Sequence, residues 1–342
     1  MKVAVIGVGS VGAQHARIYS ELPGVKLVAV ADPDPERVGM VAVRYRASPY
    51  TDYRQMLEKE RPDAVSVAVP TALHEQVGLD ALEAGAHILI EKPIADTLEG
   101  ARRLIDRARE LGRQLMVGHV VRFNPAMQAL KRKLEAGELG RVFQIFCRRI
   151  GPFPTRIRDV GVVVDLAPHD LDVMRFLLAS EPVRVYAETE RQIHTEHEDL
   201  LWGILRFPEG VVGVLELNWL TPVKIRETLV LGERGMFRVD DLNQDLYFYE
   251  NSQATDLPWS ALRMLRGVSE GCMIRYSIQR YEPLKAELEA FINALRDGRP
   301  VPVSGEDGLA ALRLALTLVE SGRKHRVVCL EPGVTRDDSW TT

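Results

Sequence analysis

The feature that most constrains this chain is a glycine-rich turn close to its N-terminus. Residues 2–6, KVAVI, are apolar and β-branched, which is typical of a buried parallel strand. Gly7-Val8-Gly9-Ser10-Val11-Gly12 follows as GxGxxG and leads into a predicted helix that ends near Glu21. Asp32 lies 20 residues beyond Gly12, at the end of a second predicted strand. A strand, this turn, a helix and a later acidic residue together predict a dinucleotide-binding βαβ unit.

Each glycine of the turn has its own predicted role. Gly7 permits a tight turn, Gly9 lets the backbone approach a pyrophosphate, and Gly12 lets the helix pack closely on the strand. The N-terminus of the helix offers backbone N–H groups and partial positive charge to phosphates. The alternative is a glycine-rich turn that holds no ligand. The predicted cofactor contacts in this turn are Gly7, Gly9, Ser10, Val11 and Gly12.

Asp32 and Arg37 bear on the choice between NAD and NADP. A carboxylate at Asp32 would accept hydrogen bonds from the adenosine ribose hydroxyls and would repel a 2′-phosphate, which favours NAD. Arg37 keeps NADP open, because a nearby arginine can accommodate that phosphate. The alternative for Asp32 is a cap or turn residue within the sequence DPDP.

The order of predicted elements indicates an α/β protein of two domains. In residues 1–120, strands alternate with helices, which predicts a doubly wound parallel sheet of the Rossmann type. In residues 121–342, short runs of β character between 182 and 250 predict a largely antiparallel sheet in a second α/β domain. That domain is expected to carry a helical C-terminal part at 283–330, and residues 251–282 show no clear pattern.

Two predicted strands of the first domain end in chemically unusual sequence. Ligands of open α/β sheets bind beyond the carboxyl ends of the strands. A Glu-Lys pair at such an end is costly unless it is paired or used. The alternative for Lys92 is a surface lysine paired with Glu91. The residues predicted to lie on the cofactor side are Val69, Pro70, Thr71, His74, Glu91 and Lys92.

A second cluster lies in DLAPHDLD, residues 165–172. If a helix begins at Asp165, then Asp165, His169 and Asp172 share one face at i, i+4 and i+7. A carboxylate one turn from an imidazole can orient it for general-base catalysis. The alternatives are an N-cap role for Asp165, a core position for His169 and, less favoured, a metal site. We expect no metal, because hydride transfer between nicotinamide and an alcohol does not require one.

Composition sets the broad class. The net charge of −4 with mixed signs argues against nucleic-acid binding, and no apolar run reaches the ~18 residues of a membrane span. Three cysteines, Cys147, Cys272 and Cys329, are far apart, which favours a reducing compartment. The N-terminus lacks the pattern of a signal peptide, so we expect a cytoplasmic protein.

The motifs, taken in order, resemble the Gfo/Idh/MocA oxidoreductase family. The matching segments are GVGSVG, ADPDPER, VPTALH, EKP at Glu91–Pro93, and DxxxHxxD at Asp165–Asp172. The resemblance implies a Rossmann domain followed by an α/β domain whose open, mostly antiparallel sheet often mediates oligomer contacts. It therefore implies a homodimer or homotetramer. Carried over by motif, it makes Lys92, Asp165 and His169 the catalytic residues and places them against substrate.

Within that family, the chain is similar to a subgroup that contains UDP-N-acetylglucosamine 3-dehydrogenases. The segments that carry this likeness are VGHVVRFNPA at 117–126, residues 235–250, EPLKAELEAFI at 282–292 and residues 303–316. The subgroup usually has GHxERFNP, and here Val121 replaces the glutamate. Arg122 and Asn124 remain candidates for substrate contact. Their alternatives are an interdomain salt bridge and a helix N-cap.

These observations predict an NAD-dependent dehydrogenase that oxidises a secondary hydroxyl of a sugar or nucleotide sugar. His169 is expected to be the acid/base, and the partner is a small-molecule substrate. One alternative keeps the family and changes the substrate to myo-inositol or a free aldose. Another, of a different class, is a non-catalytic dinucleotide-binding redox sensor. The presence of Lys92, Asp165 and His169 together argues against the sensor.

Overall fold

The computed structural model describes residues 1–154, 160–194, 196–252 and 269–330. They form two compact units. Unit 1 consists of Met1–Asn124 and Arg280–Leu314, and unit 2 consists of Pro125–Gln279 and the chain from Ala315 on. Each unit is described by itself.

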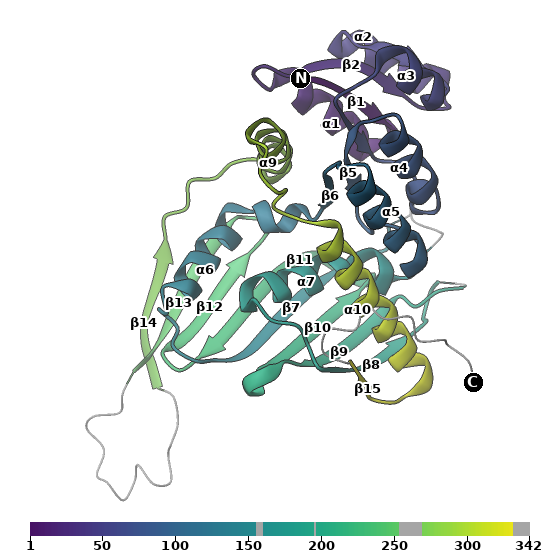
Figure 1. The fold of residues 1–342 in the computed structure, drawn as a ribbon. Helices are drawn as coiled ribbons and strands as arrows, with labels where there is room; N and C mark the ends of the chain where they lie inside the picture. The colour runs from purple at the N-terminus through teal and green to yellow at the C-terminus, as the bar shows by residue number, and fades with distance from the viewer. Residues whose placement is uncertain (155–159, 195, 253–268, 331–342) are drawn as a thin grey trace, which may run out of the picture. The chain divides into compact units, whose positions relative to one another are not determined.

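Unit 1 contains a six-stranded parallel sheet in the order β3-β2-β1-β4-β5-β6 (Figure 1). This confirms the predicted doubly wound Rossmann fold. The order reverses between β1 and β4, and a ligand crevice is expected beyond the carboxyl ends of the strands at such a switch point. The strands are β1 (Lys2–Ile6), β2 (Lys26–Ala31), β3 (Ser48–Tyr50), β4 (Ala64–Val67), β5 (His87–Glu91) and β6 (Leu115–Gly118).

The local sequence explains where these elements begin and end. The central strands are buried on both faces, as their continuous apolar runs predict; Val3, Val5 and Ile88 have no exposed surface. Thr97 accepts a hydrogen bond from the N–H of Gly100, which makes it the N-cap of the helix that follows. The sequence analysis did not identify α2 or β3. The helices are α1 (Ser10–Glu21), α2 (Pro35–Tyr45), α3 (Tyr53–Glu60), α4 (His74–Glu83) and α5 (Leu98–Glu110), with the short helices η1 (Thr71–Leu73) and η2 (Val120–Phe123).

The chain returns to unit 1 near its C-terminal end, which differs from our expectation that residues 121–342 form one domain. Helix α9 (Pro283–Asp297) packs against α1 and η2 and buries Leu288 and Phe291. Helix α10 (Gly305–Lys324) begins in unit 1 and ends in unit 2. At Gly308 an added Cβ would lie 2.6 Å from Val117, so this helix approaches β6 closely. The apolar faces of the returning helices are completed by the N-terminal segment, and element order alone does not reveal this.

Unit 2 is built on a nine-stranded sheet in the order β14-β13-β12-β11-β7-β10-β9-β8-β15. Among the described strands, β7 and β10 form the one parallel pair, so the prediction of a mostly antiparallel sheet is confirmed. The strands are β7 (Val142–Pro152), β8 (Arg184–Glu190), β9 (Leu200–Arg206), β10 (Val212–Asn218), β11 (Leu220–Gly232), β12 (Gly235–Asp240), β13 (Asp245–Ser252), β14 (Ser269–Tyr276) and β15 (Val328–Cys329).

Helices α6 (Pro125–Glu135) and α7 (Val162–Leu178) pack on one face of this sheet (Figure 1). Along β9 the side chains alternate. Leu201 and Leu205 are fully buried, whereas Trp202 and Ile204 on the opposite face are 46% and 51% exposed. The central strand β7 and the edge strand β14 were absent from the predicted set. Along most of β7, partly exposed residues alternate with buried ones. The sequence does not show this alternation, because the strand contains two adjacent arginines, Arg148 and Arg149.

Candidate active site

The glycine-rich turn of unit 1 has the geometry that its sequence predicts. Gly7 has φ of +84°, and an added Cβ there would lie 2.5 Å from the carbonyl oxygen of Ala68. At Gly12 an added Cβ would lie 1.8 Å from the carbonyl oxygen of Gly7. Both positions therefore require glycine, because no side chain can occupy the space without moving the backbone.

Gly9 differs, because an added Cβ there would meet no described atom within 4 Å. Gly9 is also the N-cap residue of α1, and it supplies no side-chain hydrogen bond to the first turn of the helix. The turn thus presents open space and the N–H groups of a helix N-terminus, a combination that suits a phosphate. These features fit the pyrophosphate of a dinucleotide.

Asp32 follows β2 directly and is 6% exposed. One carboxylate oxygen accepts a hydrogen bond from the N–H of Val8 at 2.9 Å, and the other accepts from the N–H of Asp34 at 3.0 Å. Arg37 lies beside it, with its Nη1 3.3 Å from Oδ1. Asp34, and not Asp32, is the N-cap of α2. Asp32 is therefore a turn residue and also a carboxylate attached to the glycine turn.

The segments after β4 and β5 converge on His74. Val69, Pro70 and Thr71 follow β4, and His74 is the first residue of α4. Its ring is 1% exposed. Burial lowers the pKa of His74 below its ordinary value, against the opposing influence of two carbonyl contacts and of the Glu91 charge. The neutral imidazole is therefore favoured at this position.

Glu91 ends β5 and is held by a residue that the sequence analysis missed. His15 of α1 is fully buried, and its Nε2 lies 3.1 Å from Oε1 of Glu91. Burial alone would raise the pKa of Glu91, but the contact with His15 and the charge of Lys92 lower it below its usual value. At Gly118 an added Cβ would come within 3.1 Å of this carboxyl group. The sequence signal was a histidine three residues after Gly12, on the helix face toward the sheet.

In unit 2, helix α7 begins at Val162, so the prediction that it begins at Asp165 was wrong. Gly161 is the N-cap, Val162 and Val163 are fully buried, and the N–H of Asp165 donates to the carbonyl of Gly161 at 3.1 Å. The apolar residues before Asp165 extend the helix by one turn toward its N-terminus. The N-cap alternative for Asp165 is thereby excluded.

Asp165 and His169 are one turn apart on α7, and both are partly exposed. Asp172, the third residue of the predicted face, is 1% exposed, and its carboxylate lies 3.9 Å from Arg175. The partly exposed pair therefore consists of Asp165 and His169. The pair presents a carboxylate and an imidazole from a helix that is packed on the sheet.

A buried charge cluster fixes α7 on the sheet from its other side. Asp170 accepts two hydrogen bonds from the Nε and Nη2 atoms of Arg149 on β7, at 2.9 and 2.7 Å. Nη2 of Arg149 also lies 3.3 Å from Asp241. Because Asp170 is next to His169 in sequence, this bidentate pair restrains the rotation of the helix that carries His169. The sequence analysis missed the cluster, because its members come from three separate segments.

The cluster changes the titration of its members. Burial raises the pKa of Asp241 to about 7, although the charge of Arg149 opposes this. Burial, together with the charge of Arg149, lowers the pKa of Arg226 to about 10, against the attraction of Asp170, Asp241 and Asp165. Arg226 therefore belongs to the electrostatic surroundings of Asp165.

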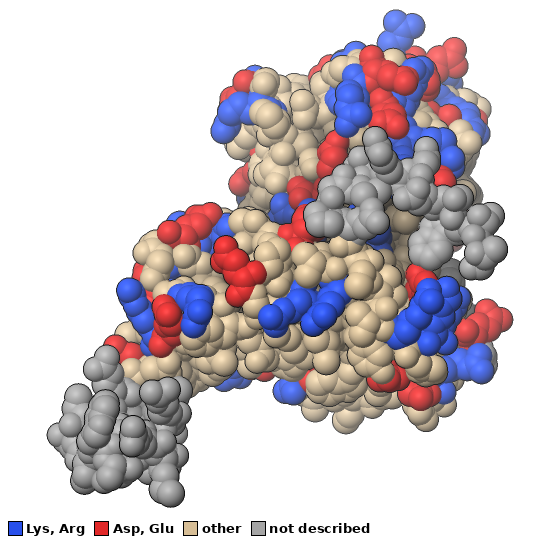
Figure 2. Space-filling view, turned by 60° about the horizontal axis from the view of Figure 1, so that its bottom comes forward, with Lys and Arg blue, Asp and Glu red and all other residues tan. Residues whose placement is uncertain are grey.

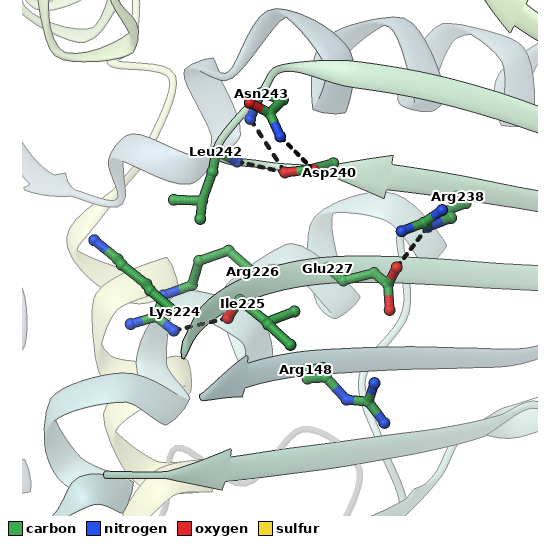
Figure 3. Close-up of a pocket in the computed structure, with 9 residues that line it drawn as sticks. All are labelled: Arg148, Lys224, Ile225, Arg226, Glu227, Arg238, Asp240, Leu242 and Asn243. Atoms are coloured by element: carbon green, nitrogen blue, oxygen red, sulfur yellow. Dashed lines mark hydrogen bonds and ion pairs between the residues drawn. The ribbon is translucent and has the colours of Figure 1, made fainter. Parts of the chain in front are cut away.

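A hollow of about 310 Å³ lies beside this cluster, over β7, β11 and the end of β12 (Figure 3). Two of its cations are paired: Arg148 lies 2.5 Å from Glu216 and Arg238 lies 2.5 Å from Glu227. None of its lining residues was among the predicted site residues. They are Arg148, Lys224, Ile225, Arg226, Glu227, Arg238, Asp240, Leu242 and Asn243.

Arg122 and Asn124 lie where the chain leaves the first part of unit 1. Arg122 forms an ion pair with Asp307 at 3.0 Å, and both residues belong to unit 1, so this is not the interdomain salt bridge that we left open for Arg122. Asn124 immediately precedes α6, and its N–H donates to the carbonyl of Val121 at 3.1 Å.

Neither a metal centre nor a membrane-spanning helix is found among the described residues. No group of three or more His, Cys, Asp or Glu side chains in the described part of the chain is arranged to hold a metal ion. None of the described helices is both long and apolar enough to cross a bilayer. On the face shown in Figure 2, Lys and Arg side chains are interspersed with Asp and Glu.

Comparison with known proteins agrees with the geometry of both units. Residues 1–119 match the oxidoreductase family with an NAD-binding Rossmann fold, and residues 127–238 match the GFO/IDH/MocA C-terminal domain. The chain belongs to the Gfo/Idh/MocA oxidoreductase family. Two proteins that resemble the chain over most of its length are named as dehydrogenases of a nucleotide sugar and of inositol.

Three known proteins show the range of likeness. UDP-N-acetylglucosamine 3-dehydrogenase of Acidithiobacillus ferrooxidans is 32% identical over 92% of this chain and 95% of its own. A solved structure of that enzyme covers 94% of this chain and 97% of its own, with a TM-score of 0.82 at 31% identity. Inositol 2-dehydrogenase of Rubrobacter xylanophilus is 28% identical over 96% of this chain and 94% of its own. The fold is also shared by a solved structure of scyllo-inositol dehydrogenase from Lactobacillus casei with NAD(H) and scyllo-inositol. The match covers 96% of this chain and 98% of that chain, with a TM-score of 0.79 at 21% identity.

Proposed function

We propose that this chain is an NAD-dependent dehydrogenase that oxidises a secondary hydroxyl group of a sugar or nucleotide sugar. The observation that carries the proposal is the pairing of Asp165 and His169 on one partly exposed face of α7, in a family of CH–OH dehydrogenases. Such a pair is suited to remove a hydroxyl proton, because the carboxylate orients the imidazole and stabilises its charged form.

In this proposal His169 takes the proton of the substrate hydroxyl as the carbon–hydrogen bond breaks. Asp165 orients the ring, and the Lys92 ammonium stabilises the negative charge that develops on the oxygen. When bound, the nicotinamide accepts the hydride. Gly9 and the N-terminus of α1 would hold the pyrophosphate, and Asp32 would accept hydrogen bonds from the ribose hydroxyls.

His169→Ala tests the assignment of the base. Positioned acid–base help is typically worth about 10²–10⁴ in rate, so kcat should fall by that factor while the affinity for NADH stays within about twofold. Asp165→Asn should lower kcat as well, because it keeps the shape and removes the charge. Near-normal turnover in His169→Ala would refute the role of His169.

The preference for NAD over NADP rests on Asp32. Its carboxylate is held against the glycine turn by the N–H of Val8, and Arg37 lies 3.3 Å away on the side toward α2. A 2′-phosphate would meet this fixed negative charge. Asp32→Ser should therefore raise the affinity for NADPH relative to NADH by at least about tenfold, the value of ~1.4 kcal/mol. An unchanged ratio would contradict the proposal.

UDP-N-acetylhexosamine is the proposed substrate class, from the relative that is 32% identical. Inositol is the second candidate, because an inositol dehydrogenase matches 96% of the chain and because Val121 stands where the subgroup motif has glutamate. A panel of UDP-N-acetylglucosamine, myo-inositol and glucose, followed by NADH absorbance, separates them. Turnover of inositol alone would refute the nucleotide-sugar assignment.

We further infer that the protein assembles as a homo-oligomer in the cytoplasm. The apolar side chains of Trp202 and Ile204 stand exposed on the sheet face opposite α7, and exposed apolar patches commonly mark association surfaces. Light scattering on the wild type and on Trp202→Glu is the test. A monomeric wild type would refute the inference.

A further inference from the structure

His74 joins two segments that follow neighbouring strands. Its Nδ1 lies 2.8 Å from the carbonyl oxygen of Pro93, and its Nε2 lies 2.9 Å from the carbonyl oxygen of Val69. Val69 follows β4 and Pro93 follows β5, and these two strands pair in parallel. The ring thus bridges the two chain segments at the carboxyl-end edge of the sheet, where ligands of such folds bind.

These contacts engage both nitrogen atoms of the His74 ring, which leaves neither nitrogen for a ligand. His74 is 1% exposed, and both of its nitrogen atoms face backbone carbonyl groups. A neutral imidazole carries one N–H, so one carbonyl at a time accepts its hydrogen bond. We expected His74 to touch the cofactor; its surroundings suit the support of neighbouring residues instead.

The contact between His74 and Pro93 holds the segment that carries Lys92. Pro93 follows it in sequence, and the carbonyl of Pro93 is the partner of His74. Glu91 precedes it, and the carboxylate of Glu91 lies 3.1 Å from the buried His15. Lys92 is therefore flanked by two residues that are anchored to different helices, α4 and α1. The charged groups that act on His74 are Glu91 and Lys92.

We propose that His74 is a positioning residue that holds the backbone of the Glu91–Pro93 segment, and through it the Lys92 ammonium, by its Nδ1 hydrogen bond to Pro93. The part of this inference that concerns catalysis rests on the proposed function, in which Lys92 stabilises charge on the substrate oxygen. A displacement of about 1 Å in such a group can cost on the order of 10² in rate.

Three substitutions separate the two bonds of the ring. In His74→Asn the side-chain amide lies near the position of Nδ1 and can still donate to Pro93. In His74→Gln it lies near the position of Nε2 and can still donate to Val69. His74→Phe fills the space and donates to neither. We expect His74→Asn to preserve the position of Lys92, and His74→Gln and His74→Phe to change it.

The first readout does not depend on turnover. Isotope-labelled reductive methylation gives each lysine an NMR signal, and Lys92→Ala identifies the signal of Lys92. In the ligand-free protein, His74→Asn should leave this signal at the wild-type position, whereas His74→Gln and His74→Phe should shift it toward the signals of exposed lysines. A shift of the same size in His74→Asn and His74→Gln, or no shift in His74→Phe, would overturn the inference.

The second readout is a double-mutant cycle on kcat, with NAD and with UDP-N-acetylglucosamine and myo-inositol as the substrates assayed. His74→Gln should lower kcat about 10- to 100-fold with KM and NADH affinity within about twofold, and should have no further effect in the Lys92→Ala background. Additive losses would overturn the inference. If Lys92→Ala retains wild-type kcat, the proposed role of Lys92 fails, whereas the NMR result still decides the positioning of its side chain.

His87→Phe is the matched control. His87 begins the same strand, five residues before Lys92, and its Nδ1 accepts a hydrogen bond from the N–H of Gln114 at 2.9 Å. This substitution should lower the melting temperature and leave the Lys92 signal unchanged. A shift of that signal in His87→Phe equal to the shift in His74→Gln would also refute the inference, because general loosening of the fold would then explain both.

Discussion

Two glycines of the same turn, Gly9 and Gly12, should respond to alanine in opposite ways. At Gly9 the backbone has φ of −64° and ψ of −161°, which alanine adopts without strain, and the added methyl group would meet no described atom within 4 Å. Alanine is a poorer N-cap than glycine. It also lowers the conformational entropy of the unfolded chain, which stabilises the folded state by about 0.4–1 kcal/mol. The stability of Gly9→Ala should therefore stay within about 1 kcal/mol of the wild type.

The same methyl group occupies the space that we expect the pyrophosphate to fill. Loss of close approach to the backbone N–H groups should cost about 2–4 kcal/mol of binding free energy, which corresponds to about 30- to 1,000-fold in Kd. Titration with NADH, followed by its fluorescence, measures this loss, and a thermal melt of the same sample measures stability. Gly9→Ala should thus bind NADH poorly while its melting temperature is nearly unchanged.

Gly12→Ala should instead damage the fold. Its methyl carbon would lie 1.8 Å from the carbonyl oxygen of Gly7, whereas ordinary contact begins near 3.4 Å, so α1 has to move by more than about 1 Å. Overpacking of this kind costs about 1–3 kcal/mol, or about 2–12 °C in melting temperature for a unit of this size. Wild-type NADH affinity in Gly9→Ala, or equal melting temperatures in the two variants, would refute the reasoning.

Two further predictions concern the buried charge cluster of unit 2. Burial raises the pKa of Asp241 from 3.8 to about 7. Between about pH 4 and pH 7, the native protein therefore keeps a proton on Asp241 that the unfolded chain has released. The free energy of unfolding consequently falls as the pH rises through this window. Asp241→Asn should therefore gain melting temperature relative to the wild type between about pH 5 and pH 8; a difference independent of pH would contradict this. Asp170→Asn should lower the free energy of unfolding, measured in urea, by about 3 kcal/mol, because it leaves the buried Arg149 with Asp241 alone. Glu227→Gln removes the charge of a partly exposed pair with Arg238 and should cost less than about 1 kcal/mol. Equal losses of unfolding free energy in Asp170→Asn and Glu227→Gln would show that burial does not strengthen the contribution of the Arg149–Asp170 pair to stability.

The parts of the fold that the sequence predicts are those set by local patterns. The parallel strands of unit 1 are continuous apolar runs, and Gly7 and Gly12 occupy positions where backbone atoms leave no space for a side chain. Thr97 caps α5 because its hydroxyl accepts a hydrogen bond from the N–H of Gly100, three positions on. In each case the sequence pattern that predicts the feature lies within a few residues of it.

The parts that the sequence did not predict depend on contacts between distant segments. His15 is separated from Glu91 by 76 positions, and Arg149 joins Asp170 and Asp241 across three elements. Helix α7 was placed one turn too late, because an acidic residue before an apolar run looks like a cap, whereas the buried Val162 and Val163 continue the helix. Such contacts have no signature in a single segment.

The return of α9 and the start of α10 to unit 1 has a consequence for synthesis on the ribosome. Residues 125–279 must be translated after Asn124 before the helices that cover α1 and β6 exist. At about 5–20 residues per second, this leaves the first unit incomplete for roughly 10–30 seconds. During that interval the apolar surface that later receives Leu288 and Phe291 is open to chaperones or to other nascent chains, so truncation after residue 124 should yield a protein that aggregates.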